Sequence, residues 1–190
     1  TGTVDFNPGL GVYNRTSVAG EADIFIHKMD ANGNFLWVRS FGDYYPDSGT
    51  GITVDAAGNV YITGYSAGVS SGADYTTIKY NSSGVQQWLQ TYNGPGNSDE
   101  DAYSLVLDAS GNIYITGYSA GSGSDYDYAT IKYNSLGAQQ WIQRYNGPGN
   151  STDDARMVAI DTSGNVYVSG TSRGIASARD YATIKYSQTI

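Results

Sequence analysis

An all-β fold built from repeated four-stranded units is predicted by three features of the sequence. The first is a 53-residue repeat, in which Asp55, Asp108 and Asp161 each open the same pattern, Asp-x-x-Gly-Asn. The second is a content of 25 Gly but only 4 Pro, which indicates many tight turns rather than a Pro-rich linker. The third is that no stretch places apolar residues at the 3.6-residue spacing of a helix.

The repeat keeps polar and aromatic residues in fixed columns, with a step of 53 residues in the later copies and 51 residues to a diverged copy upstream. All four lysines fall in one column and all three tryptophans in another. We expect three columns to be structural: Lys28, Lys79, Lys132 and Lys185; Trp37, Trp88 and Trp141; and Asp55, Asp108 and Asp161. The lysines are expected to form ion pairs with aspartates or acidic loops that fix register. The alternative is a row of lysines that contact a ligand.

Each copy divides into four β-compatible runs separated by turn signals. In the best-defined copy the runs are Ala102–Leu107, Ile113–Tyr118, Tyr128–Tyr133 and Gln139–Tyr145. The Asp108 side chain can accept a backbone N–H two residues later, and Gly111 supplies the positive φ of a short hairpin. The second run is bulky on both faces, as a buried strand should be, whereas the fourth is polar and alternating.

Four antiparallel strands in about 50 residues, repeated, are typical of a β-propeller blade. We expect about three and a quarter blades, namely a partial blade at 1–48, blades at 49–98 and 99–151, and a partial blade at 152–190. Thirteen strand runs fall short of a closed ring, which needs about four to eight blades. The exposed sheet edges are therefore expected to be covered by other copies, in a ring or a filament, or by flanking blades of a longer chain.

Three segments carry a resemblance to a known family. They are Gly-Asn-Val-Tyr-Ile-Thr-Gly, Asp-Tyr-Ala-Thr-Ile-Lys-Tyr-Asn, and Gln-Trp followed by Tyr-Asn-Gly-Pro-Gly. The chain resembles the bacterial β-propeller repeat family abbreviated SBBP, strongly over 55–186 and in diverged form over 1–54, where 2–9 is expected to extend a blade loop. The resemblance implies a secreted or cell-surface bacterial protein, often part of a larger chain. It implies no enzyme activity and no catalytic residues.

Composition excludes several classes of function. The net charge of −8 argues against a nucleic-acid partner, because affinity for phosphates rests on Lys and Arg. With 0 Cys, the chain forms no disulfides, thiolate nucleophile or Cys-ligated metal site. No apolar run reaches the ~18 residues that span a bilayer. The chain starts at Thr1 without a basic-then-apolar leader, which suggests a processed, excised or incomplete polypeptide.

Catalytic chemistry finds little support among the titratable residues. His27 is the only histidine, and the repeat places isoleucine in its column in the other copies, so we interpret it as a packing variant rather than a general base. A glycosidase needs two facing carboxylates, but Glu21 and Glu100 are the only glutamates, and most aspartates fall at turns or strand starts. We therefore expect no enzyme and no obligatory cofactor.

Two weaker site hypotheses remain. Asn97, Asp99 and Asp101 resemble the opening of a calcium loop, although the pattern breaks in the next copy and an acidic solvated turn is the alternative. Asn14, Asn81 and Asn150 match the acceptor pattern for N-glycosylation.

The leading functional hypothesis is a non-enzymatic extracellular structural or interaction module. It self-associates or forms part of a larger surface protein, and inserts into no membrane. The main alternative is a carbohydrate-binding module that uses exposed Tyr and Asp, because tyrosine rings can stack on sugars. A third reading is a fragment of a secreted enzyme. Fold analogy does not choose among them.

Overall fold

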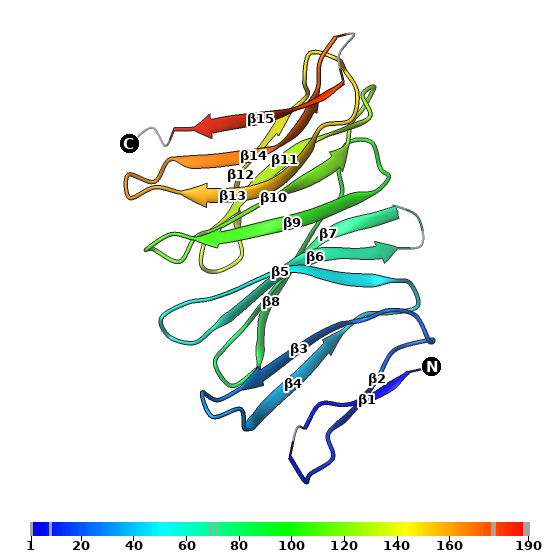
Figure 1. The fold of residues 1–190 in the computed structure, drawn as a ribbon, viewed down its shortest axis with the longest axis vertical. Helices are drawn as coiled ribbons and strands as arrows, with labels where there is room; N and C mark the ends of the chain where they lie inside the picture. The colour runs from blue at the N-terminus through cyan, green and yellow to red at the C-terminus, as the bar shows by residue number, and fades with distance from the viewer. Residues whose placement is uncertain (1, 8, 69, 71, 176–177, 188–190) are drawn as a thin grey trace.

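The computed structural model describes residues 2–7, 9–68, 70, 72–175 and 178–187, and every regular element in this part of the chain is a β-strand (Figure 1). The strands are β1 (Thr3–Asp5), β2 (Asn14–Thr16), β3 (Ile24–Met29), β4 (Phe35–Phe41), β5 (Asp47–Val54), β6 (Val60–Gly68), β7 (Gly72–Tyr80), β8 (Gln86–Tyr92), β9 (Glu100–Leu107), β10 (Ile113–Ala120), β11 (Tyr126–Tyr133), β12 (Gln139–Tyr145), β13 (Asp154–Ile160), β14 (Val166–Arg173) and β15 (Arg179–Tyr186).

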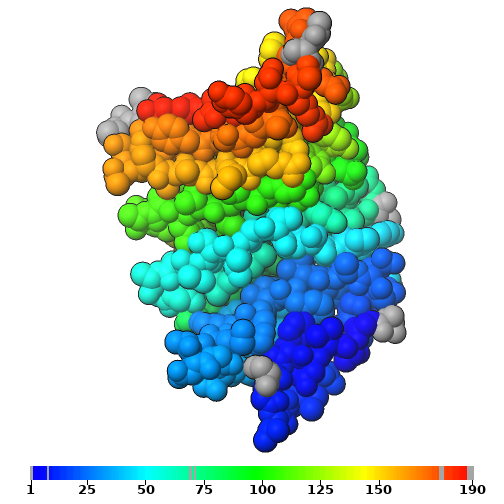
Figure 2. Space-filling model, viewed as in Figure 1, coloured from blue at the N-terminus to red at the C-terminus, as the bar shows by residue number. Residues whose placement is uncertain are grey.

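These strands form antiparallel sheets in sequence order. A hairpin, β1–β2, precedes a two-stranded sheet β3–β4, two four-stranded sheets β5–β8 and β9–β12, and a three-stranded sheet β13–β15. We call the last four sheets the first to fourth blades. They follow one another along the long axis, and the two termini lie at opposite ends (Figures 1 and 2). The predicted all-β propeller-blade fold is confirmed.

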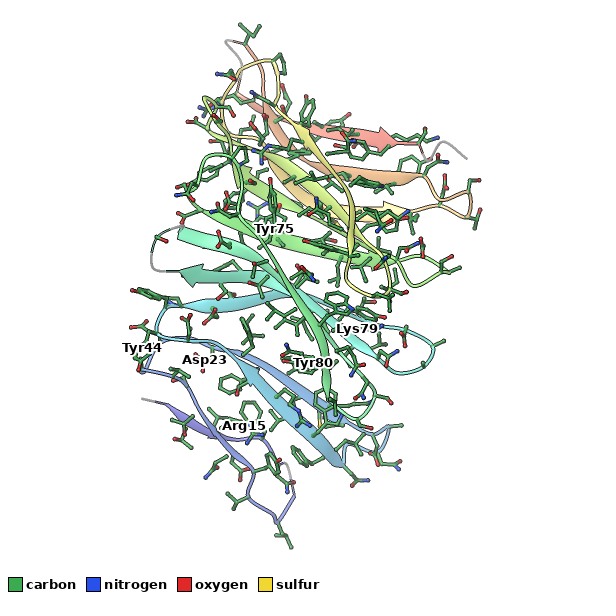
Figure 3. All side chains as sticks on the ribbon, turned by 180° about the vertical axis from the view of Figure 1, so that it is seen from behind. Arg15, Asp23, Tyr44, Tyr75, Lys79 and Tyr80 are labelled. Atoms are coloured by element: carbon green, nitrogen blue, oxygen red, sulfur yellow. The ribbon has the colours of Figure 1, made fainter. Side chains whose placement is uncertain are left out.

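The core lies between successive blades rather than at one centre. Ile26 on β3 packs with Ile62 and Ile78 of the second blade, and similar clusters join the second to the third blade and the third to the fourth. The two faces of β7 show the principle: Tyr80 packs toward the first blade and Tyr75 toward the third (Figure 3). Full burial of one such large apolar side chain stabilises the fold by about 1.5–3 kcal/mol.

A glycine in the second strand of the second, third and fourth blades lets two backbones approach closely. At Gly117 an added Cβ would lie 1.9 Å from the carbonyl oxygen of Asp101 on β9. The register between β9 and β10 shifts at this point, which marks a β-bulge. Gly64 meets the carbonyl oxygen of Ser48 on β5 in the same way.

The N-terminal insertion differs from its expected form. Instead of an extended blade loop, Thr3–Asp5 pairs with Asn14–Thr16 in a hairpin, so the described chain has fifteen strands rather than thirteen. The Asp5 side chain closes the hairpin, because its Oδ1 accepts the amide N–H groups of Asn7 at 3.0 Å and Tyr13 at 2.8 Å. The two strands have three residues each and lie exposed, so they carry no alternating pattern that sequence analysis could detect.

This hairpin covers the outward face of the first blade. The ring of Phe6 lies 5.0 Å from that of Phe25, and the ring of Tyr13 lies 4.7 Å from that of Phe35. Arg15 donates to the carbonyl oxygen of Val38 at 3.4 Å. In each later blade the equivalent face packs against the preceding blade. The hairpin therefore takes the place of a blade at this end.

Candidate functional site

The aspartate column organises one turn in each complete repeat. Asp108 Oδ1 accepts the amide N–H groups of Ser110 and Asn112, each at 2.9 Å, and Oδ2 accepts the Asn112 side chain at 2.7 Å and the Tyr114 hydroxyl at 3.1 Å. Gly111 follows with a φ of 76°. Burial raises the pKa of Asp108, but these hydrogen bonds outweigh it, and the pKa is lowered overall.

The other two members of the column make the same bonds, so the predicted turn chemistry holds in each copy. Asp55 receives the Tyr61 hydroxyl at 3.1 Å and Asp161 receives the Tyr167 hydroxyl at 3.0 Å. Burial, with the hydrogen bond to Asp55, raises the pKa of Tyr61 to about 12. The carboxylate oxygens of these aspartates thus accept hydrogen bonds from their own turns and from the tyrosine that follows.

The lysine and tryptophan columns meet between blades. Trp37 Nε1 donates to the carbonyl oxygen of Ser82 in the second blade at 3.1 Å, and Lys28 Nζ donates to the same oxygen at 2.9 Å. Trp88 and Lys79 repeat both bonds to Ser135 of the third blade, at 3.3 and 3.2 Å. We call this arrangement the Trp–Lys latch.

The latch corrects one expectation about the lysines. Lys28 and Lys79 bond to backbone carbonyls rather than to the carboxylates predicted from the sequence. Three lysines also lie over tyrosine rings on the adjacent strand, where cation–π attraction holds them. The pairs, with distances from Nζ to ring centroid, are Lys79–Tyr61 (5.1 Å), Lys132–Tyr114 (5.1 Å) and Lys185–Tyr167 (5.5 Å).

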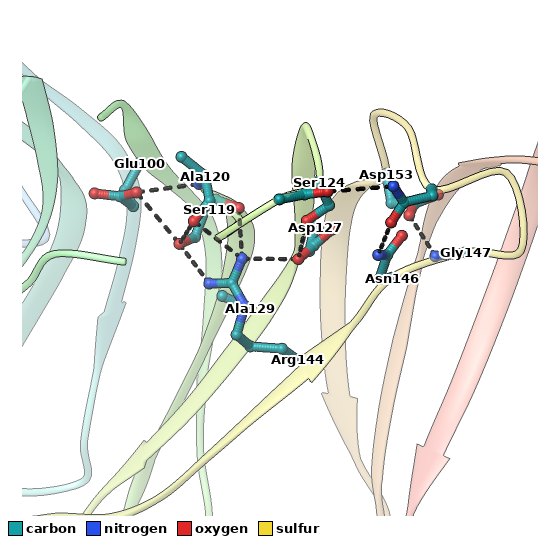
Figure 4. A network of polar contacts seen from close by, with 12 residues as sticks. Glu100, Ser119, Ala120, Ser124, Asp127, Ala129, Arg144, Asn146, Gly147 and Asp153 are labelled. Atoms are coloured by element: carbon teal, nitrogen blue, oxygen red, sulfur yellow. Dashed lines mark hydrogen bonds and ion pairs between the residues drawn. The ribbon is translucent and has the colours of Figure 1, made fainter. Parts of the chain in front are cut away.

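A further column, absent from the sequence interpretation, holds buried carboxylates at or just before the first strand of the second, third and fourth blades. It consists of Asp47, Glu100 and Asp153, which are spaced 53 residues apart and are 0–2% exposed. Asp153 accepts the amide of Gly147 at 2.5 Å (Figure 4). It also accepts the amide of Arg173 at 3.1 Å, and so ties the connection between blades to the end of the second strand. The 53-residue step was the available signal.

Glu100 makes the same connection in the third blade. Its Oε1 accepts the amide of Ala120 at 3.1 Å and the hydroxyl of Ser119 at 3.3 Å (Figure 4). Burial raises the pKa of Glu100 to about 7, helped by the charge of Asp74, because the ionised form loses its hydration. Burial likewise raises the pKa of Asp101 to about 6.

Arg144 on β12 provides a positive charge beside this column. Its guanidinium lies 3.0 Å from Asp127 and donates to Ser119 Oγ at 2.6 Å (Figure 4). It also donates to the Tyr92 hydroxyl at 3.0 Å. Tyr92 belongs to the second blade, so Arg144 links two blades. These bonds use the charged and polar groups to hold blades together rather than to face an open cleft.

The residues of the calcium hypothesis have separate partners. The Asn97 side chain accepts a hydrogen bond from Asn93 at 2.7 Å, and Asp99 accepts the amide of Ala73 at 3.1 Å. Burial raises the pKa of Asp101, and a hydrogen bond with the Tyr103 side chain partly opposes that rise. Within the described ranges, no group of three or more His, Asp or Glu residues could hold a metal ion. Calcium binding here stays a prediction.

The glycosylation candidates differ in their surroundings. Asn14 lies exposed on β2. Asn81 accepts the amides of Ser83 and Val85 in its turn, and Asn150 bonds to Asn146 and to Gly123. Modification of any of them stays a prediction.

His27 sits among aromatic rings. Its ring centroid lies 5.8 Å from that of Phe6 and 5.5 Å from that of Phe35. It takes the column position of Ile78, which is fully buried under the first blade. The histidine thus packs among aromatic side chains under the hairpin, which agrees with its interpretation as a packing variant. No membrane-spanning helix is found in the part of the chain that the structure describes.

Comparison with known proteins gives two curated relatives. The chain is 27% identical over 186 residues to an uncharacterized WD repeat-containing protein, L264, of Acanthamoeba polyphaga mimivirus, covering 77% of this chain and 13% of that protein. It is 28% identical over 120 residues to the regulatory protein FlaEY of Caulobacter vibrioides, covering 56% of this chain and 12% of that protein. The chain therefore corresponds to about an eighth of the length of these relatives.

Among solved structures, the chain is similar to a fucose lectin from Kordia zhangzhouensis in complex with methyl-fucoside. The identity is 15% and the TM-score 0.44, over 74% of this chain and 97% of that chain. The model of the beta-propeller repeat family, SBBP, matches residues 36–69, 87–123 and 140–175. Because these segments together make up more than half of the chain, the protein belongs to the beta-propeller repeat family.

Proposed function

We propose that this chain is a non-enzymatic structural or interaction module that acts outside the cell or on its surface. The observation that carries the proposal is the open edge at β15. This strand pairs with β14 alone among the described residues, whereas its counterpart β11 pairs on both sides. An unpaired strand edge is a template for pairing with another chain.

The side chains of β15 support this assignment. Tyr181 is 87% exposed, but its counterpart Tyr128 on β11 is fully buried beneath the next blade. On the inner strands, Ile52 of β5 and Met157 of β13 are 63% and 68% exposed. Covering such surfaces is favourable, so the chain self-associates, or blades of a larger surface protein cover them.

A non-catalytic role is supported by how the polar columns are used. The turn aspartates, the latch lysines and the buried carboxylates each bond to the backbone or to neighbouring side chains. Residues committed to such bonds are poorly placed to exchange protons with a substrate.

Sedimentation velocity tests the proposal. We expect the wild-type chain to sediment as an oligomer that dissociates on dilution, and Tyr181→Lys to shift it toward the 20.2 kDa monomer. Tyr44→Lys is the matched control, because Tyr44 is 75% exposed in the loop between β4 and β5, away from the β15 edge (Figure 3). A folded wild-type monomer at all concentrations overturns self-association.

A carbohydrate ligand is the second candidate, favoured by one loop. Tyr44 and Tyr45 are adjacent and 75% and 39% exposed, and exposed tyrosine rings can stack on sugars. A glycan array tests this function: sugar-specific binding that Tyr44→Ala and Tyr45→Ala abolish supports it, whereas an array without specific binding rejects it.

A further inference from the structure

The turn between β7 and β8 binds two groups from the preceding blade at once. The ring of Trp37 covers Gly84 so closely that an added Cβ would lie 2.8 Å from Cδ2 of the ring. The indole N–H and the ammonium of Lys28 both donate to the carbonyl of Ser82. The turn between β11 and β12 repeats this arrangement with Gly137, Trp88, Lys79 and Ser135.

The turn between β3 and β4 has the same backbone but an uncovered glycine. Asp30 Oδ1 accepts the amides of Asn32 and Asn34 at 2.8 and 2.9 Å, as Asn81 does in the turn between β7 and β8. Gly33 has a φ of 82°, close to the corresponding glycines. However, no described atom lies within 4 Å of an added Cβ at Gly33.

The space beside this turn is a cavity of about 330 Å³ between the β1–β2 hairpin and the first blade. Its lining residues are Asn7, Gly9, Gly33, Asn34 and Phe35. This volume is at the lower end of the range of small-ligand sites, about 300–1,000 Å³. An aromatic group can therefore enter beside the Phe35 ring and over the glycine.

The charge of the turn also differs from that of its two counterparts. Asp30 stands where the other turns have Asn81 and Asn134. Hydrogen bonds from the side chain and then the backbone of Asn34 lower the pKa of Asp30, so it is ionised at neutral pH. A carboxylate at this position attracts the cation that accompanies the indole in the latch.

From these observations we infer that the turn at 30–34 is a further latch site, which binds a tryptophan side chain presented beside an ammonium or guanidinium group. The carbonyl of Ala31 corresponds to that of Ser82 and would accept the indole N–H. The occupant is a tryptophan-bearing segment outside the described residues, because Trp37 and Trp88 already bond to turns of the next blades and Trp141 packs against Tyr186 at the other end. This goes beyond self-association at β15, which lies at the other end of the molecule (Figure 1).

Titration of the isotope-labelled protein with tryptamine, followed by NMR, tests whether the turn at 30–34 binds this ligand. Tryptamine carries both an indole N–H and an ammonium, and we expect saturable shifts of the amide signals of Gly33, Asn34 and Phe35. 1-Methyltryptamine cannot donate the indole hydrogen bond, and a loss of about 1 kcal/mol corresponds to about fivefold weaker binding. Indole-3-acetate, an anion, is expected not to bind.

Gly33→Ala should abolish the tryptamine shifts, because the methyl group would occupy the space of the ring. Gly123→Ala is the matched control: Gly123 also has a positive φ, 93°, and open space around it. Shifts that persist in Gly33→Ala overturn the inference. So does equal binding of all three ligands to the wild-type protein, a comparison that decides even if the variant fails to fold. Neither result bears on oligomerisation through β15.

Discussion

Replacing the glycine beneath a latch tryptophan tests how blades are held together. In Gly137→Ala the new Cβ would lie 2.9 Å from Cγ and Cδ2 of Trp88, so the ring must move. The φ of 84° adds strain of about 1–2 kcal/mol for a residue with a side chain. Overpacking adds about 1–3 kcal/mol. We therefore expect a total loss of about 2–5 kcal/mol in the free energy of unfolding.

Gly33→Ala separates the two contributions. Gly33 has nearly the same φ, 82°, but no described atom lies within 4 Å of its added Cβ. The loss of stability in Gly33→Ala therefore comes from backbone strain alone. Guanidinium unfolding followed by circular dichroism should show Gly137→Ala less stable than Gly33→Ala by about 1–3 kcal/mol, with an unchanged slope. Equal losses in the two variants would refute the idea that the tryptophan ring presses on the glycine.

Three further predictions concern the polar columns. The raised pKa of Glu100 means that its stabilising effect is present below pH 4.5 and lost as the pH rises through about 7. Glu100→Gln should therefore raise the free energy of unfolding over wild type by up to about 3 kcal/mol at pH 8 but by little at pH 4. The control Glu21→Gln, at an exposed residue, should leave the stability measured by thermal unfolding unchanged at both pH values. Arg144→Met leaves the buried Asp127 without its cation and should cost about 3 kcal/mol in urea unfolding; a cost under about 1 kcal/mol would contradict the assigned role of Arg144. Trp88→Phe removes the indole N–H donor, and together with lost packing should lower stability by about 1–3 kcal/mol; an unchanged midpoint in guanidinium would show that the latch bond contributes nothing.

The sequence predicts those parts of the fold that depend on local chemistry repeated at a fixed step. Asp108 and Gly111 specify their hairpin because a carboxylate accepts nearby amides and glycine adopts positive φ. Each such feature recurs at 53 residues, so one correct interpretation holds for several copies.

The parts that the sequence does not predict depend on partners without a sequence signature. Lys28 and Lys79 bond to backbone carbonyl oxygens, which every residue has. The prediction that these lysines pair with carboxylates was therefore wrong. The burial of Glu100 follows from how two blades meet, although its column spacing was visible. The β1–β2 hairpin forms because Phe6 and Tyr13 find aromatic rings on the first blade, a contact between segments with no shared pattern.

Hydrogen exchange of the β15 amides tests the proposed self-association most directly. The β15 amides that do not bond to β14 face the open edge, whereas β11 is paired on both sides and serves as the internal reference. We predict that these amides exchange slowly at high protein concentration and become fast on dilution, while β11 stays protected throughout. Fast exchange of the β15 edge at every concentration, in a folded chain, would contradict the account.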